Sequence, residues 1–238
     1  KDLFSKQLAL KFLSNVTYGY TGAGFSGRMP SVEIADAVVE TARATLEKAI
    51  KIVNEKKEWA ARVIYGDTDS MFVHVQGRSK EEAFQIGREI AAEITRINPA
   101  PVELKFEKVY QPFTVLAKKR YVGYKWESPE QKEPIFDAKG IETVRRDGCE
   151  AVRKIMERTI RILFDTSNLS QVKHYLTNQW QKILTGNINL RDFIFSREVK
   201  FGKYRRVETF PPAAIVAQKN FMKDPMRDPK YRERVFYV

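Results

Sequence analysis

The stretch ARVIYGDTDSMFVHV, residues 61–75, decides the fold of the chain around it. Its two apolar runs, ARVIYG and SMFVHV, are rich in β-branched and aromatic residues, and Asp67, Thr68 and Asp69 separate them. Such runs favour strands, whereas Asp favours turns because its side chain can hydrogen-bond the backbone that follows. The stretch therefore predicts a β-hairpin with two carboxylates at its tip.

Two helices are predicted before this hairpin. Residues 2–18 carry apolar side chains with helical periodicity, and Gly19 is the first strong breaker. A glycine-rich loop follows at residues 21–30, and Ser31 is of the residue type that caps the start of a helix. The apolar residues are Leu3, Leu8, Phe12 and Leu13 in the first helix, and Ile34, Val38, Leu46, Ile50 and Val53 in the second.

A third helix, a sheet and a helical region are predicted after the hairpin. Ser79 and Glu82 match the S-x-x-E capping box, and the helix that they begin should end before Pro99 and Pro101. From Asp147 two helical runs lead to a basic, proline-containing tail. Helices packed on an antiparallel sheet, followed by a mostly helical region, make an α+β fold. Its strands are expected at VELKFEKVY (102–110), at FTVLAKKRYVGYKW (113–126), which a basic cluster interrupts, and at PIFDAKGIETV (134–144).

The cysteine and histidine content excludes several classes of site. Cys149 is the single cysteine and cannot form an internal disulfide. With His74 and His174 it cannot complete a four-ligand zinc site, so any metal must be held by oxygen. No apolar run approaches the roughly 18–20 residues of a membrane span, and we expect no membrane partner.

The positive charge is concentrated in one half of the chain. Residues 1–116 contain 16 basic and 15 acidic side chains, whereas residues 117–238 contain 26 basic and 15 acidic ones. A half with a net charge of +11 suggests a polyanionic partner, most often nucleic acid and less often an anionic membrane surface. The alternative is a well-solvated basic surface without a partner.

Asp67 and Asp69 are candidate ligands of a divalent cation. Hard cations such as Mg²⁺ take oxygen ligands, and one or two carboxylates with substrate phosphates are their usual environment. An EF-hand is excluded, because Met71 and Phe72 stand where its third acidic ligand and its glycine belong. The alternative is that the two aspartates only form a good turn.

Two motifs in the first half resemble those of the family B DNA polymerases. YGDTDS, between two apolar runs, resembles motif C of that family. Upstream, Lys11, Asn15, Tyr18 and Gly19 reproduce the K-x-x-x-N-x-x-Y-G pattern of its motif B. The spacing places Lys11, Asn15 and Tyr18 on one helix face. Taken alone, that face could also be a solvated lysine beside a packed tyrosine.

Two further motifs extend the resemblance in the expected order. KKRY, residues 118–121, resembles the segment with which these enzymes hold primer–template DNA, and DAKGIETVRRD, residues 137–147, resembles the segment after it. The resemblance is greatest to the translesion branch of the family, with the replicative branch as the near alternative. It implies DNA-binding roles for Lys118, Lys119, Arg120, Tyr121, Lys139, Arg145 and Arg146.

The resemblance implies a DNA-directed DNA polymerase that adds deoxynucleotides to a primer 3′ end with two Mg²⁺ ions. Asp69 would be the first metal ligand and Asp67 the second. Glu107 is a further candidate near the metals, or else an outward charge on an alternating strand. Lys11 would neutralise charge on the triphosphate, Asn15 would orient its helix and Tyr18 would shape the nascent base pair.

The resemblance also implies a division of the chain and a longer parent. Residues 1–23 would end the fingers, residues 24–144 would form the palm, and residues 145–238 would form an incomplete, mostly helical thumb. The motif A aspartate is expected outside the chain, so the isolated chain should be inactive. Iron–sulfur or zinc sites would occur only in absent parent regions. Implied partners are primer–template DNA, deoxynucleoside triphosphates, accessory polymerase subunits and a sliding clamp, in the nucleus.

Parts of the sequence are also compatible with two other classes of protein. Gly22, Gly24 and Gly27 spell the G-x-G-x-x-G of dinucleotide-binding folds. That motif should leave a parallel strand, but here a helical pattern precedes it and no βαβ series follows. A DNA-binding relative without catalysis is the more serious alternative, because the basic half alone could account for binding to DNA.

Overall fold

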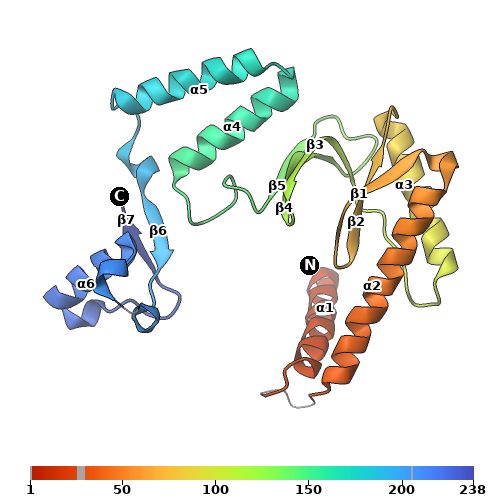
Figure 1. Cartoon of the computed structure of the whole chain (residues 1–238), viewed down its shortest axis with the longest axis horizontal. Coiled ribbons are helices and arrows are strands. Elements are labelled where there is room, and N and C mark those ends of the chain that lie inside the picture. Colours follow the sequence, from red (N-terminus) through yellow and green to blue (C-terminus); the bar gives the residue numbers. More distant parts are fainter. Residues whose placement is uncertain (1, 26–29, 205) are drawn as a thin grey trace. The chain divides into compact units, whose positions relative to one another are not determined.

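The computed structural model describes residues 2–25, 30–204 and 206–238 (Figure 1). Residues 26–29 of the predicted glycine-rich loop, Gly27 among them, lie outside the described residues. The chain forms two compact units: residues 1–109 with 126–132, and residues 110–125 with 133–238. Both contain helices together with antiparallel strands, which confirms the α+β class. The division into fingers, palm and thumb stays a prediction.

The first unit begins with two helices. α1 (Asp2–Thr21) extends through Gly19, so the predicted breaker does not end it. None of its residues is buried. α2 (Val32–Glu55) begins directly after Ser31, as predicted, although the Ser31 hydroxyl makes no capping hydrogen bond. Of the predicted apolar stripe of α2, Val53 is buried, whereas Ile34 and Val38 are exposed.

The predicted hairpin is present between α2 and α3 (Lys80–Ile97). β1 (Ala61–Asp67) pairs with β2 (Ser70–Val75) in antiparallel register. One face of the hairpin packs on a core from both helices and from the 3₁₀ turn Lys57–Trp59. The buried core residues are Ala49, Val53, Trp59, Ile90 and Ile94, and the hairpin adds Ala61, Val63, Met71 and Val73.

The hairpin contains a β-bulge at Ile64. Val63 lies opposite Val73 and Tyr65 opposite Phe72, so Ile64 has no partner in the ladder. Residues opposite each other in an antiparallel pair point to the same face, and neighbours along a strand alternate. The extra residue therefore interrupts the alternation of faces along β1.

The predicted capping box of α3 is confirmed. The Ser79 hydroxyl accepts from the Glu82 amide at 3.2 Å, and a Glu82 carboxylate oxygen accepts from the Ser79 amide at 2.8 Å.

The prediction of a strand after α3 is wrong for most of its length. Residues 102–108 form no regular strand. The Thr95 hydroxyl holds them instead, because it hydrogen-bonds both the amide and the carbonyl of Leu104.

The second unit contains a three-stranded sheet in the order β3–β4–β5. The predicted interrupted strand 113–126 is instead two strands, which reverse at Lys118 and Lys119. Lys119 adopts a φ of 61°, a left-handed conformation that turns the chain back. The strand predicted at 134–144 ends at Lys139, because Gly140 has a φ of 66°. The bounds are Val109–Ala117 for β3, Arg120–Trp126 for β4 and Ile135–Lys139 for β5.

A helical pair follows the sheet, and its first helix packs on the sheet. α4 (Glu150–Thr166) and α5 (Leu169–Leu184) confirm the two predicted helical runs. The buried Val122, Ala138 and Ile141 form the core between sheet and helix, with Phe136, Ile160 and Phe164 packed against them. Across the same contact the Tyr124 hydroxyl donates to Asp165 Oδ1 at 2.8 Å, and burial of Tyr124 raises its pKa.

The predicted tail is a folded element with its own core. β6 (Phe195–Glu198) pairs with β7 (Arg234–Tyr237), and α6 (Pro212–Lys223) packs on them, as the blue segments of Figure 1 show. The buried residues are Val199, Ala213, Ala214 and Ala217. Short 3₁₀ turns cover Leu190–Phe193, Phe201–Lys203, Val207–Thr209 and Pro225–Arg227. Among the described helices, none has the length and apolarity needed to cross a membrane.

Candidate functional site

The hairpin tip places both aspartates of YGDTDS at one tight turn. Asp67 is the last residue of β1 and pairs with Ser70, so Thr68 and Asp69 form the turn between the strands. The Thr68 hydroxyl lies 3.4 Å from Asp67 Oδ1, and the Ser70 hydroxyl donates to the Asp67 carbonyl at 3.5 Å. Asp69 is exposed, whereas Asp67 is partly buried.

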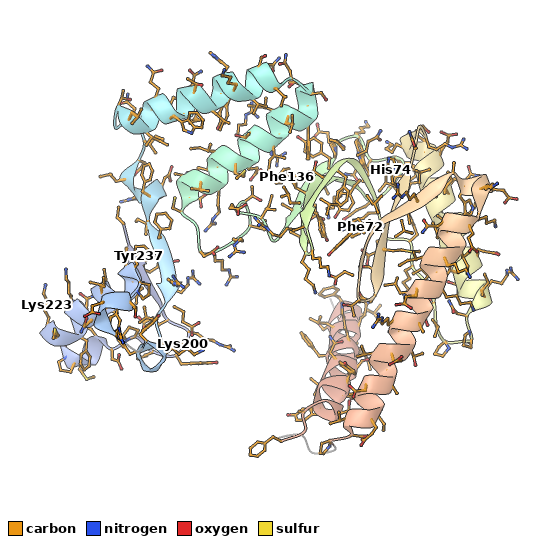
Figure 2. All side chains as sticks on the ribbon, viewed as in Figure 1. Phe72, His74, Phe136, Lys200, Lys223 and Tyr237 are labelled. Atoms are coloured by element: carbon orange, nitrogen blue, oxygen red, sulfur yellow. The ribbon has the colours of Figure 1, made fainter. Side chains whose placement is uncertain are left out.

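The bulge at Ile64 decides which face carries Asp67. Gly66 faces α2, since a Cβ there would lie 3.8 Å from Ile50 and 4.0 Å from Leu46. Tyr65 points to the other face, where its ring lies 5.4 Å from that of Phe72, a residue labelled in Figure 2. Asp67 follows Tyr65 by two residues along the strand, so its side chain points to the same face as that of Tyr65. This is the second face, away from the helices.

The donor set at this turn fits a hard divalent cation, and it is incomplete. Asp67 and Asp69 supply carboxylate oxygens, the ligands that Mg²⁺ prefers. Among residues 2–25, 30–204 and 206–238, no three His, Cys, Asp or Glu side chains form a group that could hold a metal ion. Glu107 is exposed on the irregular segment after α3 and does not complete such a group with the two aspartates.

Lys11, Asn15 and Tyr18 lie on one exposed helix, as predicted. Their spacing places them on one face of α1, and Tyr18 is 47% exposed. The Tyr18 carbonyl accepts from the Thr21 hydroxyl at 2.6 Å and from the Gly22 amide at 3.2 Å, which closes the end of the helix. The motif B residues and the acidic turn therefore belong to different elements of the first unit.

The KKRY segment forms the tip of the β3–β4 hairpin. Lys118 and Lys119 occupy the turn, and Arg120 and Tyr121 begin β4. The Lys119 carbonyl packs closely against Gly140, where a Cβ would collide with it. Glycine is therefore required at residue 140 both by its positive φ and by this close approach.

Side chains around the tip hold the basic residues in place. Tyr121 pairs with Lys139 across the ladder, and its ring lies 5.6 Å from that of Phe113. An Arg120 guanidinium nitrogen lies 2.8 Å from Glu142 Oε1, and Lys139 Nζ lies 3.6 Å from Asp137 Oδ1. The structure thus brings Lys118, Lys119, Arg120, Tyr121 and Lys139 to one end of the sheet.

Arg145 and Arg146 lie in the turn that leads from the sheet to α4. Arg145 donates two hydrogen bonds to the Asp147 carboxylate, and they lower the pKa of Asp147 to about 2. The Arg146 carbonyl accepts from the Arg234 guanidinium at 2.8 Å. The sequence alone does not indicate Arg234, because it lies 88 residues from Arg146 and no local motif marks it.

A groove of about 570 Å³ lies between α4 and α5. Arg158, His174, Tyr175 and Asn178 are among its lining residues, and burial raises the pKa of Tyr175. None of the residues predicted to bind metal, nucleotide or DNA lines this groove.

Sequence comparison relates nearly the whole chain to known polymerases. A sequence model of DNA polymerase family B matches residues 2–238. The chain is 60% identical over 236 residues to the DNA polymerase zeta catalytic subunit of Arabidopsis thaliana, and 53% identical over 236 residues to that of Saccharomyces cerevisiae. It is 35% identical over 242 residues to the DNA polymerase delta catalytic subunit of Plasmodium falciparum.

These relatives are much longer than the chain. The alignments cover 98%, 99% and 99% of this chain but only 12%, 16% and 22% of the three relatives, in the same order.

Proposed function

The chain belongs to DNA polymerase family B, and we propose that it forms part of the polymerase region of a DNA-directed DNA polymerase, a nucleotidyltransferase. We call the longer enzyme that would contain it the parent polymerase. The observation that carries the proposal is the acidic turn: in a chain of this family, a hairpin packed on a core presents Asp67 on the face away from that core and the exposed Asp69 in its turn.

The proposed reaction is attack of a primer 3′-hydroxyl on the α-phosphate of a deoxynucleoside triphosphate, with release of pyrophosphate. Asp69 and Asp67 would hold Mg²⁺. When bound, two such ions supply charge stabilisation at the attacking and leaving oxygens. Among the described residues no third carboxylate joins Asp67 and Asp69, and Glu107 does not complete the group, so the proposal needs a further carboxylate from elsewhere in the parent polymerase, such as the motif A aspartate.

The remaining site residues would bind and orient the substrates. Lys11 would neutralise charge on the triphosphate, and Tyr18 would abut the nascent base pair, with Asn15 orienting their helix. Their exposure on α1 leaves them accessible to a nucleotide. Fingers, palm and thumb are proposed at residues 1–23, 24–144 and 145–238.

The basic end of the β3–β4–β5 sheet would hold the phosphate backbone of primer–template DNA. Backbone phosphates are bound by Lys and Arg without regard to sequence. The proposed contacts come from Lys118, Lys119, Arg120, Tyr121, Lys139, Arg145 and Arg146, all of which are described in the second unit.

We assign the chain to the translesion branch of the family. Identities of 60% and 53% to the two zeta catalytic subunits, against 35% to the delta subunit, support this branch. The parent polymerase would then act in the nucleus with accessory subunits and a sliding clamp. Any zinc or iron–sulfur site would belong to other regions of the parent.

The proposal is tested by primer extension with the parent polymerase on an undamaged template and on one with a single damaged base. We expect Mg²⁺-dependent extension on both, and none from the Asp67→Ala/Asp69→Ala double variant. A double variant as active as the wild type would refute the assignment of the acidic turn. DNA binding without extension by the folded wild-type parent would favour a non-catalytic relative, and failure on the damaged template alone would favour the replicative branch.

A further inference from the structure

Arg234 joins two segments that are far apart in the sequence. It lies on β7, near the C-terminal end of the second unit, on the strand where Figure 2 labels Tyr237. Its Nε donates to the Ser196 hydroxyl at 3.0 Å, and one Nη donates both to the Ser196 carbonyl and to the Arg146 carbonyl, the latter at 2.8 Å. One side chain thus ties the turn before α4 to the β6–β7 pair.

The turn that Arg234 holds is also fixed from within. Arg145 donates to both carboxylate oxygens of Asp147. Arg197, on β6, adds a second positive charge near that carboxylate and contributes to its lowered pKa. The β6–β7 pair therefore acts on this turn twice, through Arg234 on the backbone and through Arg197 on Asp147.

Arg146 is the residue of this turn whose side chain remains available to bind a ligand. It is exposed, and within the described residues its guanidinium forms no ion pair. Its backbone carbonyl is the atom that Arg234 holds. Fixing a backbone beforehand lowers the entropy lost when the side chain on it binds a ligand, and ordering a long side chain is a substantial cost of association.

We propose that Arg234 is a positioning residue, which holds the 145–147 turn so that the Arg146 guanidinium is presented to a backbone phosphate of the bound DNA. This inference rests on the proposed function for the ligand, but it adds a residue that no polymerase motif in the sequence marks. It also gives the folded C-terminal element, whose sequence predicts only a basic tail, a part in DNA binding without a contact of its own.

The interaction requires arginine rather than any cation. A planar guanidinium presents several N–H groups in a fixed fork, and here it spans a hydroxyl and two carbonyl oxygens. A lysine has one rotatable ammonium group and cannot bridge the same three acceptors in this geometry. The Arg234→Lys substitution therefore keeps the positive charge but removes the hydrogen bonds that hold the turn.

The experiment measures the affinity of the parent polymerase for primer–template DNA across a salt titration. We compare Arg234→Ala, Arg234→Lys, Arg146→Ala and the Arg146→Ala/Arg234→Ala double variant. Lys219→Ala is the control, because Lys219 is an exposed cation on α6 with no ion pair among the described residues. Circular dichroism checks the folding of each variant, and Arg234→Lys serves if Arg234→Ala does not fold.

We expect Arg234→Ala and Arg234→Lys each to weaken binding about three- to tenfold, the scale of ordering one long side chain. Arg146→Ala should lower the salt slope by about 0.9, the value for one phosphate contact. The double variant should bind no more weakly than Arg146→Ala, and Lys219→Ala should bind within about twofold of wild type, well inside the effect of ordering one side chain.

Three results would overturn the inference: full affinity in Arg234→Lys, additive losses in the double variant, or unchanged affinity in Arg234→Ala. The first two would show that Arg234 meets DNA through its own charge. A folded wild-type parent that does not bind DNA would instead contradict the proposed function, so the two failures are distinguishable.

Discussion

Asp69 occupies the turn between β1 and β2, where its carboxylate is exposed. We expect Asp69→Ala in the parent polymerase to reduce nucleotide incorporation more than about a hundredfold, because the charge stabilisation supplied by the metals is worth several kcal/mol. Primer–template affinity should change little, since no phosphate-binding group is removed. Steady-state incorporation and DNA affinity are measured together, with Asp36→Ala as the control for an exposed aspartate on α2.

The same two measurements, incorporation and DNA affinity, are made on Asp67→Ala. Asp67 is partly buried at the strand end, and we expect its loss to cost less activity than the loss of Asp69. Incorporation by Asp69→Ala within about threefold of wild type, a difference of less than ~0.7 kcal/mol in transition-state stabilisation, would contradict the metal assignment.

Asp147 makes the stability of the 145–147 turn sensitive to acid. The hydrogen bonds from Arg145 lower the pKa of Asp147 from its usual 3.8 to about 2 in the folded state. A lowered folded pKa contributes stability above the unfolded pKa, and that stability is lost as the pH falls from about 4 towards 2. We expect Asp147→Asn to lower the thermal unfolding midpoint at pH 6, and this difference to shrink over that range.

Arg145→Gln is the matched variant for this effect, because it removes the same pair from the basic side. It should show the same loss at pH 6 and the same convergence with wild type in acid. A difference between wild type and Asp147→Asn that stays constant from pH 6 to pH 2 would show that the Arg145 pair does not stabilise the folded state.

The hairpin that carries Asp67 and Asp69 at its tip could be predicted from the sequence, but the face of Asp67 could not. Plain alternation along β1 would place Asp67 on the same side as Ala61 and Val63, which pack on the core. The bulge at Ile64 reverses this, and a bulge depends on pairing with the partner strand rather than on a local residue signal.

Among the elements, the β3–β4 hairpin depends on a glycine from the segment after β5. Gly140 has a φ of 66°, and a Cβ there would collide with the Lys119 carbonyl. Gly186, in the same unit, has a φ of 72° with open space around it. We expect Gly186→Ala to cost about 1–2 kcal/mol for the left-handed conformation alone. Gly140→Ala should cost more, because its backbone must also move.

The measurement for these glycines is urea unfolding followed by circular dichroism, together with DNA affinity. Gly140→Ala should also weaken DNA binding, because it displaces the turn that carries Lys118 and Lys119. Equal effects of the two substitutions would show that the close approach of the Lys119 carbonyl does not constrain the hairpin.

The tip of the same hairpin is predicted to set part of the salt dependence of DNA binding. Replacing Lys118, Lys119 and Arg120 with alanine should weaken binding to unrelated sequences about equally, and should lower the salt slope by about 0.9 for each phosphate that is no longer bound. The control replaces three exposed cations of α2 with alanine, which makes the same change in net charge: Arg43, Lys48 and Lys51. A slope that both triple variants share would show that the tip is only a solvated surface.

Elements defined by local chemistry were predictable, and those that need a distant partner were not. The capping box of α3 depends on two residues three positions apart, and both of its hydrogen bonds are present. Residues 102–108 keep the alternating burial of a strand, with Leu104 and Phe106 partly buried, but Thr95 rather than a neighbouring strand holds them. The β6–β7 pair joins residues far apart in the sequence, from Phe195 with Tyr237 to Glu198 with Arg234, which no local pattern marks.

For the whole molecule, the uneven charge and the incomplete carboxylate set lead to one prediction. The chain of 238 residues, if folded, should bind primer–template DNA without sequence preference, and five phosphate contacts would give a slope of log K against log salt of about −4.5. It should not extend a primer, because its described residues bring no three metal-ligating side chains together. DNA binding and Mg²⁺-dependent extension are assayed on the same preparation.

The comparison for that assay is the parent polymerase, which should extend the primer under the same conditions. Extension by the 238-residue chain alone would contradict the need for a further carboxylate. The family could be predicted from four short motifs, because the residues of each motif are close together in the sequence and lie in one element or in two neighbouring ones. The Arg234 interaction could not, because it joins residues 88 positions apart.

The bulge in β1 also bears on how this region tolerates insertions and deletions during evolution. On one side of Ile64, residues 61–63 pair with 75–73, and on the other, residues 65–67 pair with 72–70. Without Ile64 these pairs would be consecutive on both strands. A homologous strand one residue shorter at this point would therefore keep the same partners and the same carboxylate face, whereas a length change between Tyr65 and Asp67 would turn the carboxylate towards α2.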